Sequence, residues 1–91
     1  DYPSVSPLHC FLKDTGRASY TSATDEDALK AYELVSRLEN ISPSLEPSHA
    51  FHTAISLAPK LNKDSLLIVN SCGHSRKDAE IIKSRLGYYT A

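Results

Sequence analysis

The chain has 91 residues, of which 41% are apolar and 23% charged, and its formal net charge is −1 at pH 7. This composition suits one small globular domain, or part of a larger one, and excludes a disordered tail. The near-neutral charge gives no general attraction to nucleic acid or anionic membranes, and no apolar run is long enough to cross a bilayer.

Residues 1–17 are predicted to be an irregular lead segment, with one short turn around residues 8–13, because prolines and glycine interrupt any periodic apolar pattern. An irregular lead of this length is uncommon in a free-standing small domain. It fits better as a segment laid over a larger protein. Residues 18–91 are predicted to form a single α/β domain or subdomain.

A short strand and a helix are predicted next. Residues 19–23 contain the strand former Tyr20. Thr24 then begins a helix, because its hydroxyl can accept a backbone hydrogen bond and the acidic residues after it favour the positive end of the helix dipole. Apolar residues follow at helical spacing, and we expect the helix to end at Asn40.

A second helix is predicted to begin near Pro47, which suits the first helical position. Apolar residues line one face of this helix: Ala50, Ala54, Leu57, Ala58 and Leu61. Pro59 should disturb the last turn, because proline cannot donate the backbone hydrogen bond that a helix interior needs.

The continuous apolar run Leu-Leu-Ile-Val at residues 66–69 predicts a strand covered on both faces, as in a parallel sheet. A third helix should run from about residue 76 to Leu86 and end at Gly87. The order strand, helix, helix, strand, helix predicts an α/β fold with a right-handed crossover. This is a β-α-α-β-α fragment of a mostly parallel, helix-covered sheet.

The loop at residues 71–75, Ser-Cys-Gly-His-Ser, is the best site candidate from the residues alone. Ligands of open α/β sheets collect where a strand ends and a helix begins. The alternative is an ordinary turn that needs Gly73 for its geometry, and composition favours that alternative. Glu46, at the start of the second helix, is either a site carboxylate or a first-turn acid stabilised by the helix dipole.

Histidines and cysteines permit two further kinds of site. His49 and His52 are three residues apart and share a helix face, but no third metal ligand follows at a suitable spacing. Cys10 and Cys72 each lie near a histidine without a paired-ligand pattern, so we expect no metal site. Cys72 with a histidine base would resemble a Cys–His hydrolase, but nothing specifies oxyanion donors.

Residues 39–50, Glu-Asn-Ile-Ser-Pro-Ser-Leu-Glu-Pro-Ser-His-Ala, resemble a segment of the tryptophan synthase β-subunit that reads Glu-Gly-Ile-Ile-Pro-Ala-Leu-Glu-Ser-Ser-His-Ala. Residues 69–78, Val-Asn-Ser-Cys-Gly-His-Ser-Arg-Lys-Asp, resemble Val-Asn-Leu-Ser-Gly-Arg-Gly-Asp-Lys-Asp of the same family. Residues 1–7 and 11–20 continue the likeness, the latter to plant and cyanobacterial members. It covers nearly the whole chain and looks like the C-terminal portion of the family.

The resemblance implies a fold type II, pyridoxal-phosphate (PLP)-dependent lyase that joins indole to L-serine to make L-tryptophan. It implies that Glu46 lies beside the cofactor, and that Cys72 and the adjacent Gly73 also bind it. Cys72 stands where the family has a serine that faces the pyridine nitrogen. A thiol is a weaker hydrogen-bond donor than a hydroxyl. Arg76 stands where the family has an aspartate, so the chain diverges at its cofactor loop.

The Schiff-base lysine and the phosphate-binding glycines lie upstream in the family and have no counterpart here. We therefore expect no catalytic residue in this chain, and neither PLP binding nor catalysis by the chain alone. One hypothesis is the C-terminal part of a divergent β-subunit that works with a larger protein. The alternative is a non-catalytic family fragment that serves as a structural or interaction subunit of a larger assembly.

Only two cysteines are present, too few for a disulfide framework, so a reducing intracellular compartment is expected. The likeness to plant and cyanobacterial sequences adds the plastid to the cytoplasm as a predicted location.

Overall fold

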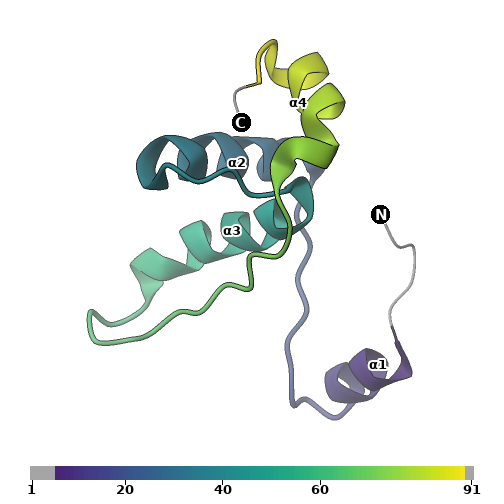
Figure 1. Cartoon of the computed structure of the whole chain (residues 1–91). Coiled ribbons are helices and arrows are strands. Elements are labelled where there is room, and N and C mark those ends of the chain that lie inside the picture. Colours follow the sequence, from purple (N-terminus) through teal and green to yellow (C-terminus); the bar gives the residue numbers. More distant parts are fainter. Residues whose placement is uncertain (1–5, 90–91) are drawn as a thin grey trace.

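The computed structural model describes residues 6–89, which form four α-helices and two 3-10 turns (Figure 1). The helices are α1 (Pro7–Asp14), α2 (Asp25–Glu39), α3 (Leu45–Leu57) and α4 (Ala79–Leu86). The 3-10 turn η1 (Ala58–Lys60) follows α3, and η2 (Ser75–Asp78) leads into α4. None of the helices in this part of the chain has the length and apolar character needed to span a membrane.

The predicted β-α-α-β-α sheet is wrong, because residues 6–89 contain no β-strand. Residues 19–23 and 66–69, the two predicted strands, run as extended segments without a ladder (Figure 1). The pairing found in residues 6–89 is a single antiparallel bridge between Pro43 and His74. The physical reason is that a strand needs a neighbouring strand to accept and donate its hydrogen bonds, and neither segment meets one here.

The helix α2 begins and ends where the sequence predicts. The Thr24 hydroxyl accepts a hydrogen bond from the Asp27 amide at 3.1 Å, and the Asp27 carboxylate accepts one from the Thr24 amide at 3.2 Å. This capping box satisfies amides that have no partner inside the helix. The hydrogen bond from the Thr24 backbone amide is the largest of the causes that lower the pKa of Asp27, and a side-chain interaction with Thr24 lowers it further. Asn40 ends the helix with a left-handed φ of 56°, a conformation that asparagine tolerates.

The other two predicted helices have shifted boundaries. The helix α3 begins at Leu45, two residues before the predicted start, and Pro47 fits its first turn because the missing amide has no helical partner there. The α-helix ends at Leu57, and Pro59 lies in η1. The third predicted helix is divided into η2 and α4, and it ends at Gly87 with a φ of 86°.

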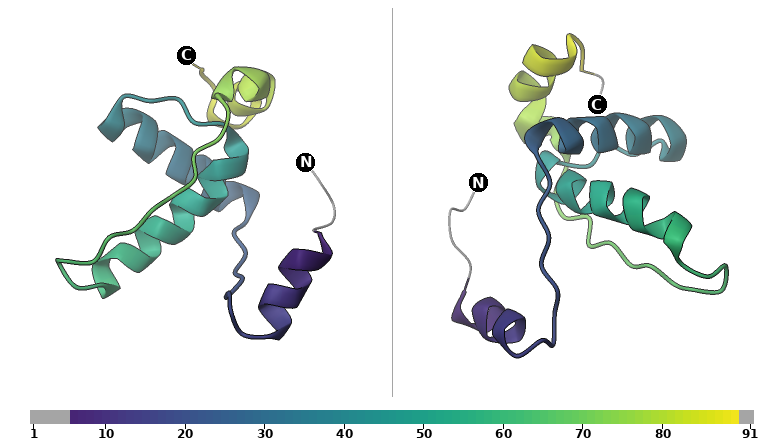
Figure 2. Two further views of the ribbon diagram at one scale, coloured as in Figure 1. Left: turned by 60° about the horizontal axis from the view of Figure 1, so that its bottom comes forward. Right: turned by 180° about the vertical axis from the view of Figure 1, so that it is seen from behind.

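A small core holds α2, α3 and α4 together. Leu29 and Tyr32 of α2 contact Ile82 of α4, and Leu45, Leu86 and Tyr89 pack against this cluster. The helix α2 lies against α3, while α4 crosses near one end of both (Figures 1 and 2). Within residues 6–89, six hydrophobic side chains are buried: Ala28, Leu29, Ala31, Tyr32, Val35 and Ile82.

The helix α1 stands away from the other three helices and is joined to them by a turn at residues 15–18 and an extended stretch at residues 19–24 (Figure 2). The sequence predicted only a short turn there, whereas Pro7 begins an eight-residue helix. No residue of α1 is buried. The radius of gyration is 14.5 Å, larger than the roughly 12 Å expected of a compact domain of this length. The rest of the predicted lead segment, residues 1–5, lies outside the described residues, as do residues 90 and 91.

Candidate functional site

The two stretches that carry the family resemblance meet in space. We call residues 42–46 and 72–78 together the motif junction. The bridge between Pro43 and His74 lies at its centre, and the Ser75 amide donates to the Ser42 carbonyl at 3.0 Å. The motif junction connects the start of α3 with the turn that leads into α4, so helices distant in sequence fix its geometry.

A chain of hydroxyl groups supports the motif junction from the core side. The Ser75 hydroxyl is fully buried, hydrogen-bonds to the Ser42 hydroxyl, and lies 3.0 Å from the Tyr89 hydroxyl. The Ser42 hydroxyl also lies 3.5 Å from the Tyr32 hydroxyl. Buried hydroxyls are costly without partners, and these four satisfy one another. The cluster therefore supports the fold at the motif junction.

The N-terminus of α3 is closed by protein groups. The Leu45 amide donates to the Asp78 carboxylate at 2.9 Å, and Asp78 is only 8% exposed. The Ser44 hydroxyl donates to the Cys72 carbonyl at 3.0 Å, and the Ser48 hydroxyl donates back to the Ser44 carbonyl at 2.8 Å. An anion such as a phosphate would have to displace Asp78 to reach this helix end.

The three residues predicted to bind cofactor, Glu46, Cys72 and Gly73, lie around Lys77. The Lys77 ammonium donates to the Glu46 carboxylate and lies 4.0 Å from a carboxylate oxygen of Asp78. Gly73 has a φ of +81°, and a Cβ there would lie 3.4 Å from the Ser44 hydroxyl and 3.9 Å from Cε of Lys77. These are ordinary contact distances, so glycine is favoured here by its left-handed conformation and not by lack of space. Sequence reasoning did not identify Ser44 and Asp78 as the groups that hold this arrangement, although Asp78 matches the family motif.

The charges at the motif junction shift two pKa values in opposite directions. The hydrogen bond from Lys77, and then its charge, hold the pKa of Glu46 below its ordinary value of 4.5. The hydrogen bond to Glu46 raises the pKa of Lys77 above 10.5, and the negative charge of Asp78 adds to the rise. Both partners are therefore charged at neutral pH.

Replacing Glu46 with Gln should make the stability of the chain less sensitive to acid. A lowered pKa in the folded state means that the ion pair stabilises the fold above pH 4.5, and that this contribution is lost as the pH falls through the folded-state value. The thermal midpoints of wild type and Glu46→Gln should differ at neutral pH and converge in acid. The effect should be small, because both side chains are partly exposed. Glu80→Gln, at an exposed position on α4, is the control. An unchanged gap in acid would contradict this assignment.

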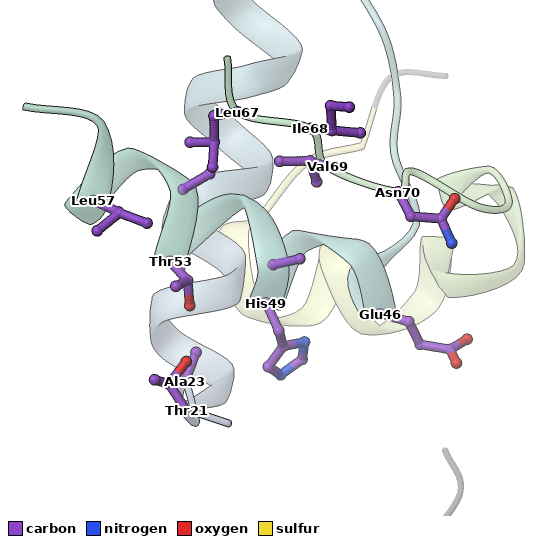
Figure 3. Close-up of a pocket in the computed structure, with 12 residues that line it drawn as sticks. Thr21, Ala23, Glu46, His49, Thr53, Leu57, Leu67, Ile68, Val69 and Asn70 are labelled. Atoms are coloured by element: carbon purple, nitrogen blue, oxygen red, sulfur yellow. The ribbon is translucent and has the colours of Figure 1, made fainter. Parts of the chain in front are cut away.

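A groove of about 480 Å³ extends from the motif junction along α3 (Figure 3). The helix α3 lies at its centre, with residues 67–70 on one side and Thr21 and Ala23 on the other. Its lining from α3 consists of Glu46, His49, Ala50, Thr53, Ala54 and Leu57. Part of the apolar face predicted for the second helix thus lines this groove. The sequence analysis did not predict this groove. The feature that could have indicated it is the apolar run at residues 66–69, which was interpreted there as a buried strand.

The histidines of α3 lie near carboxylates in the first turn of α2. Nε2 of His49 lies 3.6 Å from the Asp25 carboxylate, and Nε2 of His52 lies 3.7 Å from the Asp27 carboxylate. Among residues 6–89, no three His, Cys, Asp or Glu side chains are grouped to hold a metal ion. Nor does a hydrogen bond in this part of the chain join the Cys72 thiol to a histidine, so the Cys–His hydrolase reading gains no support.

The described residues do not fit PLP as a whole. The cofactor needs a lysine for its imine and several donors for its phosphate. Lys77 is held by Glu46, and the Leu45 amide at the start of α3 is held by Asp78. What remains is a surface with an exposed Cys72 thiol beside Gly73.

No family model matches the chain. It is 51% identical over 87 residues to the tryptophan synthase beta chain of Rhodopseudomonas palustris (strain TIE-1), covering 96% of this chain and 22% of the relative. The same protein of Cereibacter sphaeroides is 47% identical over 88 residues, with 97% and 22% covered.

The tryptophan synthase beta chain of Nitrosomonas europaea is 49% identical over 87 residues, with 96% and 22% covered. The chain thus spans about a fifth of the length of these relatives. All three relatives are bacterial, which gives no support to a plastid location. The resemblance found in the sequence is confirmed: over nearly its whole length, this chain is related to part of the tryptophan synthase β chain.

Proposed function

We propose that this chain is the C-terminal part of a tryptophan synthase β-type enzyme, that it lies beside the PLP cofactor, and that it is not competent alone. The motif junction carries this proposal, because it gathers Glu46, Cys72 and Gly73 around Lys77. A larger polypeptide would supply the imine lysine and the phosphate donors. The reaction of the whole enzyme would convert L-serine and indole to L-tryptophan.

These residues would position the cofactor ring and would not react with it. The Ser44 hydroxyl donates a hydrogen bond to the Cys72 carbonyl, which holds in place the loop that would face the cofactor ring. The Glu46–Lys77 pair keeps two opposite charges together and leaves little net charge beside the ring. The Cys72 thiol is exposed and would be a weak hydrogen-bond donor toward a ring nitrogen.

A second function, that of a non-catalytic structural subunit in a larger assembly, is favoured by one observation. The polar groups at the motif junction are satisfied by one another, as the Leu45–Asp78 and Ser42–Ser75 contacts illustrate. A site of this kind needs no ligand to be stable. The departures from the family pattern at Cys72 and Arg76 agree with this second function.

The isolated chain should neither show the absorption of a PLP Schiff base nor form L-tryptophan, and Cys72→Ser should not create either property. The expectation follows from the missing covalent anchor and phosphate donors, which a better hydrogen bond at one position cannot replace. Absorption spectroscopy with added PLP and a tryptophan assay are the measurements. Tryptophan formation by the isolated variant would overturn the claim that the chain is not competent alone.

The two functions are separated by a chimera. The stretch of the Rhodopseudomonas palustris β chain that matches this chain is replaced with residues 1–91, and the unaltered relative is the control. A folded chimera with Schiff-base absorption and tryptophan formation supports the enzyme part. A folded chimera without the absorption band supports the structural subunit. A chimera that fails to fold while the control folds contradicts both.

A further inference from the structure

We propose that Tyr89 is a positioning residue of the motif junction. Through Ser75 and Ser42 it ties the residues that follow α4 to the loop that carries Cys72. We call the hydroxyl groups of Ser42, Ser75 and Tyr89 the tail clamp. This role rests on the proposed function and deepens it, because it assigns a residue that would hold the cofactor-facing loop in place.

The residues after α4 turn back toward α2 (Figure 1). Gly87 makes this turn with a left-handed φ of 86°. The two tyrosines that follow have different partners. The Tyr88 hydroxyl donates to the Glu33 carboxylate on α2, whereas the Tyr89 hydroxyl lies 3.0 Å from the Ser75 hydroxyl. Tyr89 also packs against the core cluster, so its ring has a fixed place.

Ser75 connects Tyr89 to the motif junction. Ser75 is 0% exposed, and its hydroxyl hydrogen-bonds to the hydroxyls of both Tyr89 and Ser42. Its amide donates to the Ser42 carbonyl at 3.0 Å. A buried polar group that loses a partner is costly, so the position of Tyr89 affects the loop at residue 75, three residues after Cys72.

The two serines of the tail clamp are departures from the family pattern, and they contact each other. Position 42 is isoleucine in the pattern that residues 39–50 resemble, and position 75 is glycine in the pattern that residues 69–78 resemble. One isoleucine and one glycine carry as many side-chain heavy atoms as two serines, so the exchange keeps the filled volume nearly constant. It supplies two hydroxyls within reach of Tyr89 where the pattern has none. The tail clamp is therefore a feature of this chain and not of the pattern it resembles.

The tail clamp and Ser44 hold the two ends of the same turn. The Ser44 hydroxyl donates to the Cys72 carbonyl, and Ser75 is held by Tyr89, with Gly73 between these two attachments. A loop that is in place for only part of the time binds its ligand correspondingly more weakly. Tyr89 would thus raise the affinity for the cofactor by acting through Ser75.

The first test compares Tyr89→Phe with Tyr88→Phe in the chimera described above. Each substitution removes one hydroxyl, and the two positions are adjacent, but only Tyr89 belongs to the tail clamp. The Ser75 amide should exchange its hydrogen at least roughly threefold faster in Tyr89→Phe and change by less than about twofold in Tyr88→Phe, because loss of a hydrogen bond lets the loop open more often. This measurement needs no cofactor.

The second test measures the dissociation constant of PLP from the same chimera by its Schiff-base absorption. Tyr89→Phe should raise this constant roughly two- to tenfold, the range that the loss of one hydrogen bond implies, and Tyr88→Phe should change it less than about twofold. The double variant Ser42→Ile, Ser75→Gly restores the family residues and removes the partners of Tyr89. In that background Tyr89→Phe should have no further effect on exchange or on PLP binding.

The outcomes distinguish the positioning role from the function on which it rests. Equal effects of the two tyrosine substitutions in a chimera that binds PLP overturn the role of Tyr89 and leave the proposed function standing. An undiminished effect of Tyr89→Phe in the double variant also overturns it, since Tyr89 would then act through another contact. A folded chimera without the Schiff-base band overturns the proposed function, while faster exchange at Ser75 in Tyr89→Phe alone would still support the tail clamp. A chimera that fails to fold while its parent folds overturns both.

Discussion

Ile82→Ala should lower the free energy of unfolding of this chain by about 2–5 kcal/mol, the usual cost of removing a large buried aliphatic side chain. Ile82 is 0% exposed and contacts Leu29 and Tyr32, so the substitution leaves a cavity where α2 and α4 meet. Total stability of a small domain is on the order of 5–15 kcal/mol, and the core here is small. Urea titration followed by circular dichroism should show a lower midpoint or no folded baseline.

Ile81→Ala is the matched control, because the two positions are adjacent on α4 and carry the same side chain. Ile81 is 53% exposed, so its truncation should change the unfolding free energy by about 0.5 kcal/mol or less. Equal losses from the two substitutions would mean that the α2–α4 contact does not form the core. A loss at Ile81 alone would mean that α4 is rotated about its axis.

Asp78→Ala should cost about 1–3 kcal/mol, because it leaves the Leu45 amide unsatisfied at the closed end of α3. Asp78→Asn keeps one acceptor oxygen at the same place and should lose less. Denaturant unfolding measures the cost, and hydrogen exchange at Leu45 tests its origin, since that amide should exchange faster in the alanine variant.

Asp64→Ala is the control for this experiment, because Asp64 is an exposed acid in a turn. It should change stability by about 0.5 kcal/mol or less. If Asp78→Ala destabilises no more than Asp64→Ala, the carboxylate does not connect the two halves of the motif junction. If Asp78→Asn loses as much as Asp78→Ala, the hydrogen bond does not account for the cost.

The helices could be predicted because their signals are local. Thr24 and Asp27 form the predicted α2 start within four residues, and Asn40 and Gly87 end helices through their own left-handed conformations. The predicted helix boundaries were wrong where a distant residue determines them. The helix α3 begins earlier than predicted because the carboxylate of Asp78, far along the chain, accepts a hydrogen bond from the Leu45 amide. A local pattern has no information about such a partner.

The prediction of strands was wrong because a strand depends on a distant partner and not on a local signal. The apolar run at residues 66–69 has the composition of a buried strand, but a strand exists only with a neighbour, and none lies in residues 6–89. The sequence therefore showed that these residues have the composition of a strand, but residues 6–89 contain no strand with which they could pair. The gathering of Glu46, Cys72 and Gly73 followed from two motifs that resemble one family, but the ion pair between Glu46 and Lys77 needed coordinates.

The detached position of α1 has a consequence for how the chain could be monitored. An eight-residue helix with no buried residue is short for what helix nucleation permits in water, so its helicity depends on contact with another surface. Leu8 and Phe11 are both exposed on it, which makes such contact favourable. A spectroscopic probe attached to α1 should therefore report assembly: α1 should show little helical order in the free chain and more once another surface covers it.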